Sequence, residues 1–299
     1  MIRALVVGRE RPGRPIPEVV ADVAERLRAA GWDIDTAVVK RKRDVRRATR
    51  RALKDERDVV VAVGGDGAVL QVATVLAESK VALGVIPTGT GNLLAGNLKI
   101  PTDRDQAVET VLTGRPRRID VGRLKIDGKK RVFTVACGIG YDAKVMDATE
   151  PESKMRWGKL AYLANALGQA GSLHNSPHEI TLDGVCHTME AAQVFIANFG
   201  KMLPVAQPRR KIRGDDGLLD IIVIRAAGPV PALLAGWEAL MQRDLGESAG
   251  GHVFRAQARD VRVRSDPNRL VETDGSIAGK TPIDVSIRPR ALTVIVPKR

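Results

Sequence analysis

Aromatic residues and cysteines are scarce in this chain of 299 residues. Phe, Trp and Tyr make up 3% of it, and the only two cysteines are Cys137 and Cys186. The hydrophobic core must therefore consist mainly of Val, Leu, Ile and Ala side chains. A chain of this length with two cysteines does not depend on a disulfide framework, and we expect both thiols to be buried and reduced in a cytoplasmic protein.

Long apolar runs are also missing. The longest apolar stretch, AAGPVPALLAGWEALM at 226–241, contains proline, glycine and a charged residue, whereas a transmembrane helix needs about 20 mainly apolar residues. The opening residues, MIRALVVGRE, are typical of a β-strand and lack the longer apolar segment and cleavage site of a signal peptide. Any contact with a membrane is therefore expected to be peripheral.

Acidic residues are outnumbered, with 35 Asp and Glu against 48 Lys and Arg and a net charge of +13. This surplus favours phosphorylated ligands, acidic lipid surfaces or nucleic acid, although a solvated basic surface without a partner gives the same composition. In the densest segment, KRKRDVRRATRR at 40–51, a helix would align Arg43, Arg47 and Arg50, with Arg46 close by. This face could contact an anionic lipid or a phosphate group; a solvated basic face is the plainer interpretation. The basic segments lack interleaved aromatic residues, which argues against single-stranded nucleic acid as a partner.

Strand and helix patterns alternate in the first third of the chain. The strand patterns lie at 3–7, 32–39, 57–63 and 81–86, and the helical patterns at 17–31, 43–53 and 68–79. This alternation predicts βαβ units and a parallel sheet. From about residue 117 short strand patterns follow, with Asp-Gly pairs at 127, 183, 216 and 274 that predict hairpins, and with helical patterns at 154–171 and 231–245. We therefore expect an α/β domain over 1–122 and a mostly β domain over 123–299.

The motif GGDG at 64–67 follows a buried strand pattern and precedes a helix. Ligands of open parallel sheets bind beyond the carboxyl ends of the strands, where glycines allow positive φ angles and close approach of the backbone. Backbone N–H groups before a helix bind anions, but Asp66 would repel a bare phosphate. The motif therefore predicts a nucleotide phosphate with Mg²⁺ between it and Asp66. The alternative is a tight turn in which Asp66 is the helix N-cap.

A second turn of this kind, PTGTGN at 87–92, ends the next strand pattern. Thr88, Thr90 and Asn92 offer neutral hydrogen-bonding groups, and Gly89 and Gly91 offer bare backbone. Because the two turns end neighbouring βα units, we expect them to line one crevice.

These segments, VVVAVGGDGAVLQVATVL at 59–76 and GVIPTGTGNLLAGNLKIP at 84–101, resemble the catalytic domain of diacylglycerol kinases and sphingosine kinases. The likeness continues through IDVGRL at 119–124, ACGIGYDAKVM at 136–146, DDGLLDIIVI at 215–224 and VETDGS at 271–276. NAD kinases and phosphofructokinases share the Gly-Gly-Asp-Gly turn, whereas PTGTGN and DGLLD favour the lipid-kinase branch. The resemblance implies an N-terminal Rossmann-like parallel-sheet domain, a C-terminal β-sandwich domain and an active site in the cleft between them.

The resemblance also implies an activity and a set of partners. The chain would be a kinase that uses ATP and Mg²⁺ to phosphorylate a lipid hydroxyl, with diacylglycerol as the first candidate and phosphatidic acid as product. Its partners would be the lipid substrate at a membrane surface and anionic lipid, with no nucleic acid; family members can form homodimers. Two alternatives stay open, which are a kinase of a soluble substrate, similar to NAD kinases, and a nucleotide- or lipid-binding protein that has lost catalysis.

Individual roles follow from the same resemblance. Asp66 and Asp120 would belong to a carboxylate and water network around the catalytic Mg²⁺. Asp274 matches the general base, which takes the proton of the lipid hydroxyl as its oxygen attacks the γ-phosphoryl group. The nucleotide-binding set comprises Gly64, Gly65, Asp66, Gly67, Thr88, Gly89, Thr90, Asn92 and Asp120.

The segment RGDDGLLD at 213–220 resembles a loop that holds a structural Mg²⁺ in bacterial relatives. The carboxylate of Asp216 and the backbone carbonyls of Arg213 and Leu218 would be its ligands. The alternative is an Asp-Gly hairpin turn.

The chain departs from the family pattern at several polar positions. Family members usually carry Asn-Pro where this chain has Gly8 and Arg9, Thr in place of Ala68, and Asn-Glu in place of Leu70 and Gln71. They also carry Asp in place of Leu93 and Glu in place of Ser276. Glu272 lies two residues before Asp274 and would share a strand face with it, so we hypothesise that Glu272 partly replaces the missing glutamate. ATP binding is expected to survive these departures, and the catalytic rate is the property that they put at risk.

Overall fold

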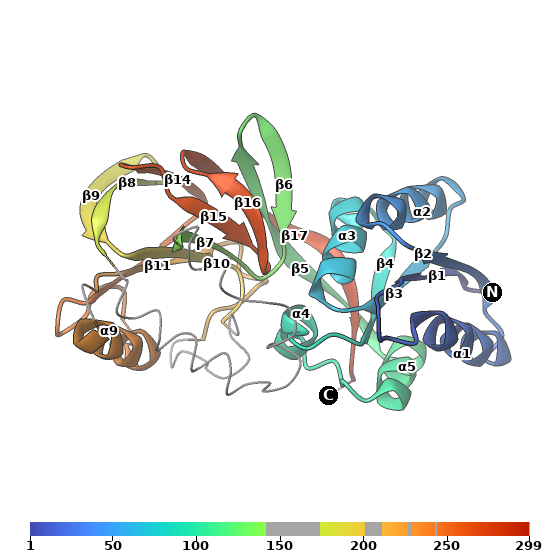
Figure 1. Cartoon of the computed structure of the whole chain (residues 1–299). Helices are drawn as coiled ribbons and strands as arrows, with labels where there is room; N and C mark the ends of the chain where they lie inside the picture. Colours follow the sequence, from blue (N-terminus) through green and yellow to red (C-terminus); the bar gives the residue numbers. More distant parts are fainter. Residues whose placement is uncertain (142–173, 201–210, 227–228, 243, 299) are drawn as a thin grey trace. The chain divides into compact units, whose positions relative to one another are not determined.

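The computed structural model describes residues 1–141, 174–200, 211–226, 229–242 and 244–298 (Figure 1). The chain divides into two compact units, Met1–Val121 with Pro289–Arg299, and Gly122–Arg288. The sequence had suggested that the last residues belong to the second domain. They join the first unit because β17 (Ile283–Val296) ends in parallel pairing with β4 (Ala82–Pro87), through Val294 and Leu83.

The first unit is a parallel sheet with helices on both faces, as expected. The strands β1 (Arg3–Arg9), β2 (Asp33–Val39), β3 (Val59–Gly64) and β4 lie in the order β2-β1-β3-β4, followed by β17. The helices are α1 (Ile16–Ala29), α2 (Lys42–Lys54), α3 (Asp66–Leu76), α4 (Leu93–Asn97) and α5 (Arg104–Thr113). Helix α1 packs against α5, and α2 packs against α3, so that one pair covers each face (Figure 1).

Apolar patterns explain this arrangement. All of β3 is buried, as a continuous β-branched run predicts for a strand covered on both faces. Helix α1 buries Val20, Val23 and Leu27 at helical spacing. It ends just before Gly31, whose φ of +84° is the left-handed conformation that favours glycine at a helix end.

The second unit is an antiparallel β-sandwich, which confirms the predicted fold class. One sheet runs β12-β13-β11-β10-β7-β15-β16; in the other, β9, β8 and β14 lie beside the first half of β17. Residues of both sheets form one core of Val, Ile, Leu, Ala and a few larger side chains. The remaining elements of the chain are β5 (Arg115–Ile126), β6 (Lys129–Phe133), β7 (Ala136–Tyr141), β8 (Ser176–Leu182), β9 (Val185–Ala191), β10 (Gln193–Ala197), β11 (Leu219–Ile224), α9 (Pro229–Met241), β12 (Gly246–Glu247), β13 (Val253–Ala258), β14 (Asp260–Ser265), β15 (Leu270–Thr273) and β16 (Ser276–Lys280).

Three of the four Asp-Gly pairs form the predicted two-residue hairpins. Asp127-Gly128, Asp183-Gly184 and Asp274-Gly275 have positive φ at both residues and join directly paired strands. The hairpin predicted at Asp216-Gly217 is wrong. Only the glycine has a positive φ there, and the segment is a turn that leads into β11.

Two other expectations need correction or lie outside the described residues. Cys137 is buried, but Cys186 is exposed because it lies on β9, the last strand of its sheet, with its side chain on the outer face. The helical pattern at 154–171 falls outside the described residues. Among the helices that the structure describes, none is long and apolar enough to cross a membrane.

Candidate active site

The strand order of the first unit places a ligand site by topology. From β1 the chain continues to β2 on one side, and β3 lies on the other side, so the sheet has a switch point between β1 and β3. Ligands of such sheets bind outside the carboxyl ends of the strands at this point. The segments that meet there are the loop 10–15, after β1, and Gly65 with the first turn of α3, after β3.

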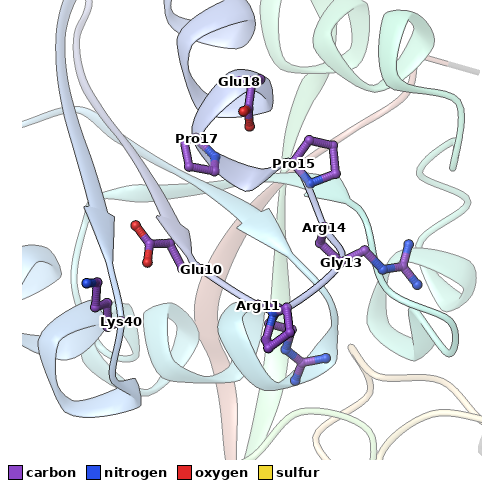
Figure 2. A pocket seen from close by; sticks show the side chains of 9 residues that line it. Glu10, Arg11, Gly13, Arg14, Pro15, Pro17, Glu18 and Lys40 are labelled. Atoms are coloured by element: carbon purple, nitrogen blue, oxygen red, sulfur yellow. The ribbon is translucent and has the colours of Figure 1, made fainter. Parts of the chain in front are cut away.

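An open hollow of about 730 Å³ borders the first of these loops (Figure 2). Its walls are residues 10–15, the start of α1 with Pro17 and Glu18, and Lys40 after β2. Arg11 and Arg14 extend from the loop in different directions, and Glu10 lies on the side of Lys40 (Figure 2). The carboxyl edge of the sheet therefore carries a hollow with several cationic side chains.

The two glycine turns touch each other backbone to backbone. That they line one crevice stays a prediction, because the hollow of Figure 2 is lined by other residues. An added Cβ on Gly89 would lie 2.6 Å from the Cα of Gly65, and one on Gly65 would lie 3.0 Å from the Cα of Gly89. Thr88 N also donates to Gly64 O at 3.0 Å. The expectation that these glycines adopt positive φ angles is wrong, since no glycine from 64 to 91 has a positive φ. Glycine is required here by close approach.

Asp66 joins the two turns. Its Oδ1 accepts a hydrogen bond from Leu93 N at 2.6 Å, so its carboxylate caps the start of α4. The N-cap of α3, the helix that contains Asp66, is Gly65. The alternative in which Asp66 is the N-cap of this helix is therefore wrong. Burial raises the pKa of Asp66, and backbone N–H groups, that of Leu93 first, act in the opposite direction.

Asn92 shapes the second turn from within. It has a φ of +46°, its Oδ1 accepts from Gly89 N at 3.1 Å, and its Nδ2 donates to Gly89 O at 2.8 Å. The amide that the sequence offered to a ligand therefore closes the turn. Thr88 is half-buried and Thr90 is exposed, so the hydroxyl of Thr90 lies within reach of a ligand in solvent.

Asp120 lies on β5 and is fully buried. Its Oδ1 accepts a hydrogen bond from Arg290 N at 2.7 Å, and Arg290 has a φ of +50°. This bond holds β17 against β5 inside the first unit.

Asp274 occupies the turn between β15 and β16 in the second unit. Oδ2 accepts from Thr134 N at 2.6 Å and from Thr134 Oγ1 at 2.9 Å, and Oδ1 accepts from Val135 N at 2.9 Å and Ala136 N at 3.1 Å. A carboxylate has about four lone-pair positions, so these bonds fill it. Burial raises the pKa of Asp274, while the same hydrogen bonds act against that shift.

Glu272 lies close to this turn, with its Oε1 3.9 Å from an added Cβ on Gly275. The thiol of Cys137 has a pKa raised above its usual range, first by burial and then by the charges of Asp274 and Glu272. Glu272 lies on β15 and Asp274 in the turn that follows it, so the two do not share a strand face as expected, although the charges of both act on this thiol.

The predicted structural metal loop contains one side-chain ligand. Asp216 is exposed, and its Oδ1 accepts from Leu218 N at 3.1 Å. Arg213 is exposed and donates from Nε to Asp215 Oδ1 at 3.2 Å. Within the described ranges no three His, Cys, Asp or Glu side chains gather as a metal site. Asp216 is the one side-chain ligand of the predicted site, whose other ligands are backbone carbonyls, so a metal at this loop stays a prediction.

Two family models match almost the whole chain. Residues 4–124 match the family model of the diacylglycerol kinase catalytic domain, and residues 134–296 match that of the YegS C-terminal NAD kinase beta sandwich-like domain. A diacylglycerol kinase of Mycobacterium tuberculosis is 30% identical over 292 residues, which cover 91% of this chain and 88% of that protein. A diacylglycerol kinase of Bacillus subtilis is 27% identical over 308 residues, covering 100% and 97% of the two chains.

A protein of Synechocystis is 28% identical over 262 residues, covering 87% of this chain but 59% of its own length. The crystal structure of a putative diacylglycerol kinase from Bacillus anthracis superposes with a TM-score of 0.82 and covers 98% of this chain and 96% of that one. At 22% sequence identity, that likeness establishes the fold alone.

Proposed function

Because this chain belongs to the diacylglycerol kinase family of lipid kinases, we propose that it transfers the γ-phosphoryl group of ATP to a lipid hydroxyl, with diacylglycerol as acceptor and phosphatidic acid as product. The lipid oxygen forms a bond to phosphorus as the bond between that phosphorus and ADP breaks. The hydroxyl proton passes to a carboxylate of the protein.

One observation carries the proposal, which is the contact between the two glycine turns at the carboxyl ends of β3 and β4. The close approach of Gly65 and Gly89 and the bond from Leu93 N to Asp66 make a rigid wall beside the first turn of α3. The N-terminus of that helix favours an anion, and phosphoryl transfer requires mainly positioning and charge neutralisation. We assign the phosphates of ATP to this wall, with the hydroxyl of Thr90 as a further donor.

Magnesium enters this proposal as the counter-ion that ATP brings with it. The described side chains do not form a carboxylate cage for it, so we derive no step through a metal held by the protein. The structural metal at Asp216, with carbonyls of Arg213 and Leu218, stays a prediction that metal analysis of the purified protein would test.

We assign the proton to Asp274, which must first release one of its four hydrogen bonds to residues 134–136. Its raised pKa suits a proton acceptor better than an ordinary aspartate would. Glu272 lies beside the turn and is the carboxylate best placed to assist, which keeps the hypothesis that it replaces the missing glutamate.

A lipid acceptor requires contact with a bilayer surface, and α9 supports that contact. The side chains of Leu234 and Trp237 are 48% and 62% exposed and lie three residues apart on the helix. The acidic group of α9, Glu238, points into the unit and accepts from His252 N at 3.2 Å and from Ser248 Oγ. The exposed side of α9 thus presents apolar side chains, which suit the interface of a membrane.

The test is transfer of radiolabelled γ-phosphate from ATP to lipids in mixed micelles with Mg²⁺. Diacylglycerol, monoacylglycerol, sphingosine and ceramide are compared, with NAD as a soluble acceptor and Asp274→Asn as the control. A labelled lipid that disappears with the variant supports the proposal and names the acceptor. Labelled NAD in its place, or ATP binding without any labelled product, would overturn it in favour of a soluble acceptor or a non-catalytic protein.

A further inference from the structure

The four hydrogen bonds that hold the carboxylate of Asp274 come from two kinds of donor. Three donors are the backbone N–H groups of residues 134–136. The fourth is the hydroxyl of Thr134, whose Oγ1 lies 2.9 Å from Asp274 Oδ2. A backbone N–H group only donates, whereas a hydroxyl carries one hydrogen and two lone pairs and turns to suit its partner. Of these four donors, the Thr134 hydroxyl is therefore the one that can also accept a hydrogen bond from Asp274.

The backbone donors are fixed in place by further hydrogen bonds. Asp274 N donates to Ala136 O at 3.1 Å while Ala136 N donates to Asp274 Oδ1, so the turn and the segment 134–136 hold each other in both directions. Asn198, which is fully buried, holds the same segment, because its Nδ2 donates to Thr134 O at 2.8 Å. A shift of the three N–H groups would break these bonds, whereas a turn of the hydroxyl breaks only its own.

A proton that reaches Asp274 changes what its carboxyl group needs from these partners. The ionised group accepts all four bonds, whereas the neutral group has an O–H that must donate. Oδ1 faces two N–H groups, and Oδ2 faces one N–H group and the Thr134 hydroxyl. A buried O–H without an acceptor is costly, and among the four partners only the hydroxyl offers lone pairs. Oδ2 is therefore the oxygen that suits the proton, with the hydroxyl turned to accept its hydrogen bond.

The surroundings of Asp274 bring its two protonation states closer in free energy. Burial raises its pKa, and the hydrogen bonds from residues 134–136, that of the Thr134 hydroxyl included, act in the opposite direction. Two titratable groups lie beside the turn, Glu272 on β15 and Cys137 on β7. The charges of Asp274 and Glu272 add to the effect of burial and raise the pKa of the thiol, so Cys137 stays neutral. Glu272 is then the charged neighbour, and a second negative charge favours the neutral form of Asp274.

We propose that Thr134 is a positioning residue for the proton acceptor. Its hydroxyl donates to ionised Asp274 and turns to accept from the protonated form, so that Asp274 takes up and releases a proton without losing a hydrogen bond. The inference rests on the proposed function, in which the O–H bond of the lipid breaks as its oxygen bonds to phosphorus. The proton then ends on Oδ2 of Asp274 and leaves to water before the next turnover.

The experiment removes the hydroxyl and keeps the backbone bonds. Thr134→Val preserves the shape of the side chain and its N–H group, and Thr134→Ser returns a hydroxyl to the same position. Thr110→Val is the matched control, because Thr110 is also buried and its hydroxyl donates to Gln106 O at 2.8 Å within α5. Thermal unfolding shows whether each variant is folded. Thr134→Cys, whose thiol is only a weak hydrogen-bonding group, takes the place of Thr134→Val if the valine variant does not fold.

The first measurement is the pH dependence of kcat for lipid phosphorylation. We expect Thr134→Val to lower kcat about fivefold at the pH optimum, with KM for ATP and lipid unchanged. The acid limb of its pH profile should move up by about one unit, because the bond to the ionised form is the stronger of the two that the hydroxyl makes. Thr134→Ser and Thr110→Val should match the wild type.

The second measurement follows Asp274 directly and needs neither ATP nor lipid. Infrared spectra taken across a pH titration show the carbonyl band of a protonated carboxyl group, and the part of this band that Asp274→Asn lacks belongs to Asp274. Its midpoint should lie about one pH unit higher in Thr134→Val than in the wild type. Thr134→Ser should restore the midpoint of the wild type.

Three results would overturn the inference: an unchanged kcat in Thr134→Val, an unchanged midpoint of the Asp274 titration, or an equal loss in Thr110→Val. A serine variant as slow as the valine variant would also overturn it, since the side chain would then act by packing alone. Failure of the proposed function shows instead in the wild type, which would label no lipid. The infrared titration would still decide whether the Thr134 hydroxyl controls the protonation of Asp274.

Discussion

Replacing Gly89 with alanine tests the contact on which the candidate active site is built. The new Cβ would lie 2.6 Å from the Cα of Gly65 and 2.9 Å from the Oδ1 of Asn92. Carbon atoms in contact normally lie about 3.5–4.0 Å apart, so the first overlap is about 1 Å and involves backbone on both sides. Overpacking of this kind costs roughly 1–3 kcal/mol. Loss of backbone freedom in the unfolded chain returns about 0.4–1 kcal/mol, because Gly89 does not need a positive φ.

We therefore expect Gly89→Ala to lose about 1–2 kcal/mol of unfolding free energy and to bind ATP more weakly at temperatures where it is still folded. Gly67→Ala is the matched control for stability, because its Cβ would have only Arg11 Nη2 nearby, at 3.9 Å. It should be as stable as the wild type or slightly more so, since alanine favours a helix. Urea unfolding and thermal melting of both variants give the answer. Equal stability of Gly89→Ala and wild type, or an equal loss in Gly67→Ala, would refute the backbone-contact argument.

Three further predictions follow from other parts of the structure. Burial lowers the pKa of His178, so the unfolded chain binds this proton more tightly than the folded chain does. The contribution of His178 to stability is therefore fully present above about pH 6.5 and is lost at lower pH. Melting temperatures measured from pH 8 to pH 5 should decline less for His178→Gln than for the wild type. Asp274→Asn should lose about 1–3 kcal/mol of stability as well as activity, because an amide oxygen and an NH₂ group cannot accept all four hydrogen bonds. Glu272→Gln should lower kcat with little change in melting temperature. Full activity in that variant would remove Glu272 from the reaction. In a variant whose only tryptophan is Trp237, emission should shift to shorter wavelength on anionic vesicles and be quenched by brominated lipid, and an unchanged spectrum would exclude α9 from the bilayer contact.

Local patterns in the sequence determined most of the secondary structure. Helix α1 and strand β3 each lie where the apolar spacing predicts them, because a helix face and a buried strand leave a repeat in neighbouring residues. The Asp-Gly pairs at 127, 183 and 274 form hairpins because the turn depends on two adjacent residues with positive φ. The pair at Asp216 forms no hairpin, because only Gly217 has a positive φ and the described residues just before it form no strand.

The sequence also determined that two glycine turns end neighbouring strands of a parallel sheet, and hence that they lie close together. The structure then decided what their side chains do. The carboxylate of Asp66 caps α4, 27 residues away in the chain, and Asn92 closes its own turn. The Asp274 carboxylate accepts hydrogen bonds from the N–H groups of residues 134–136, which precede it in the chain by 138 to 140 positions.

Only the tertiary structure decided which residues of different segments meet. Residues 289–299 belong to the first unit because β17 pairs with β4. Because α2 packs beside β1, the charges of Arg9 and Arg11 act on Lys42 and help to lower its pKa. Such contacts depend on strand order and on the packing of whole elements, which leave no repeat in the local sequence. The chain alone thus determined where α1, α2, α3 and α9 lie and three of its hairpin turns, and packing between distant segments decided which charges and hydrogen-bonding groups come together.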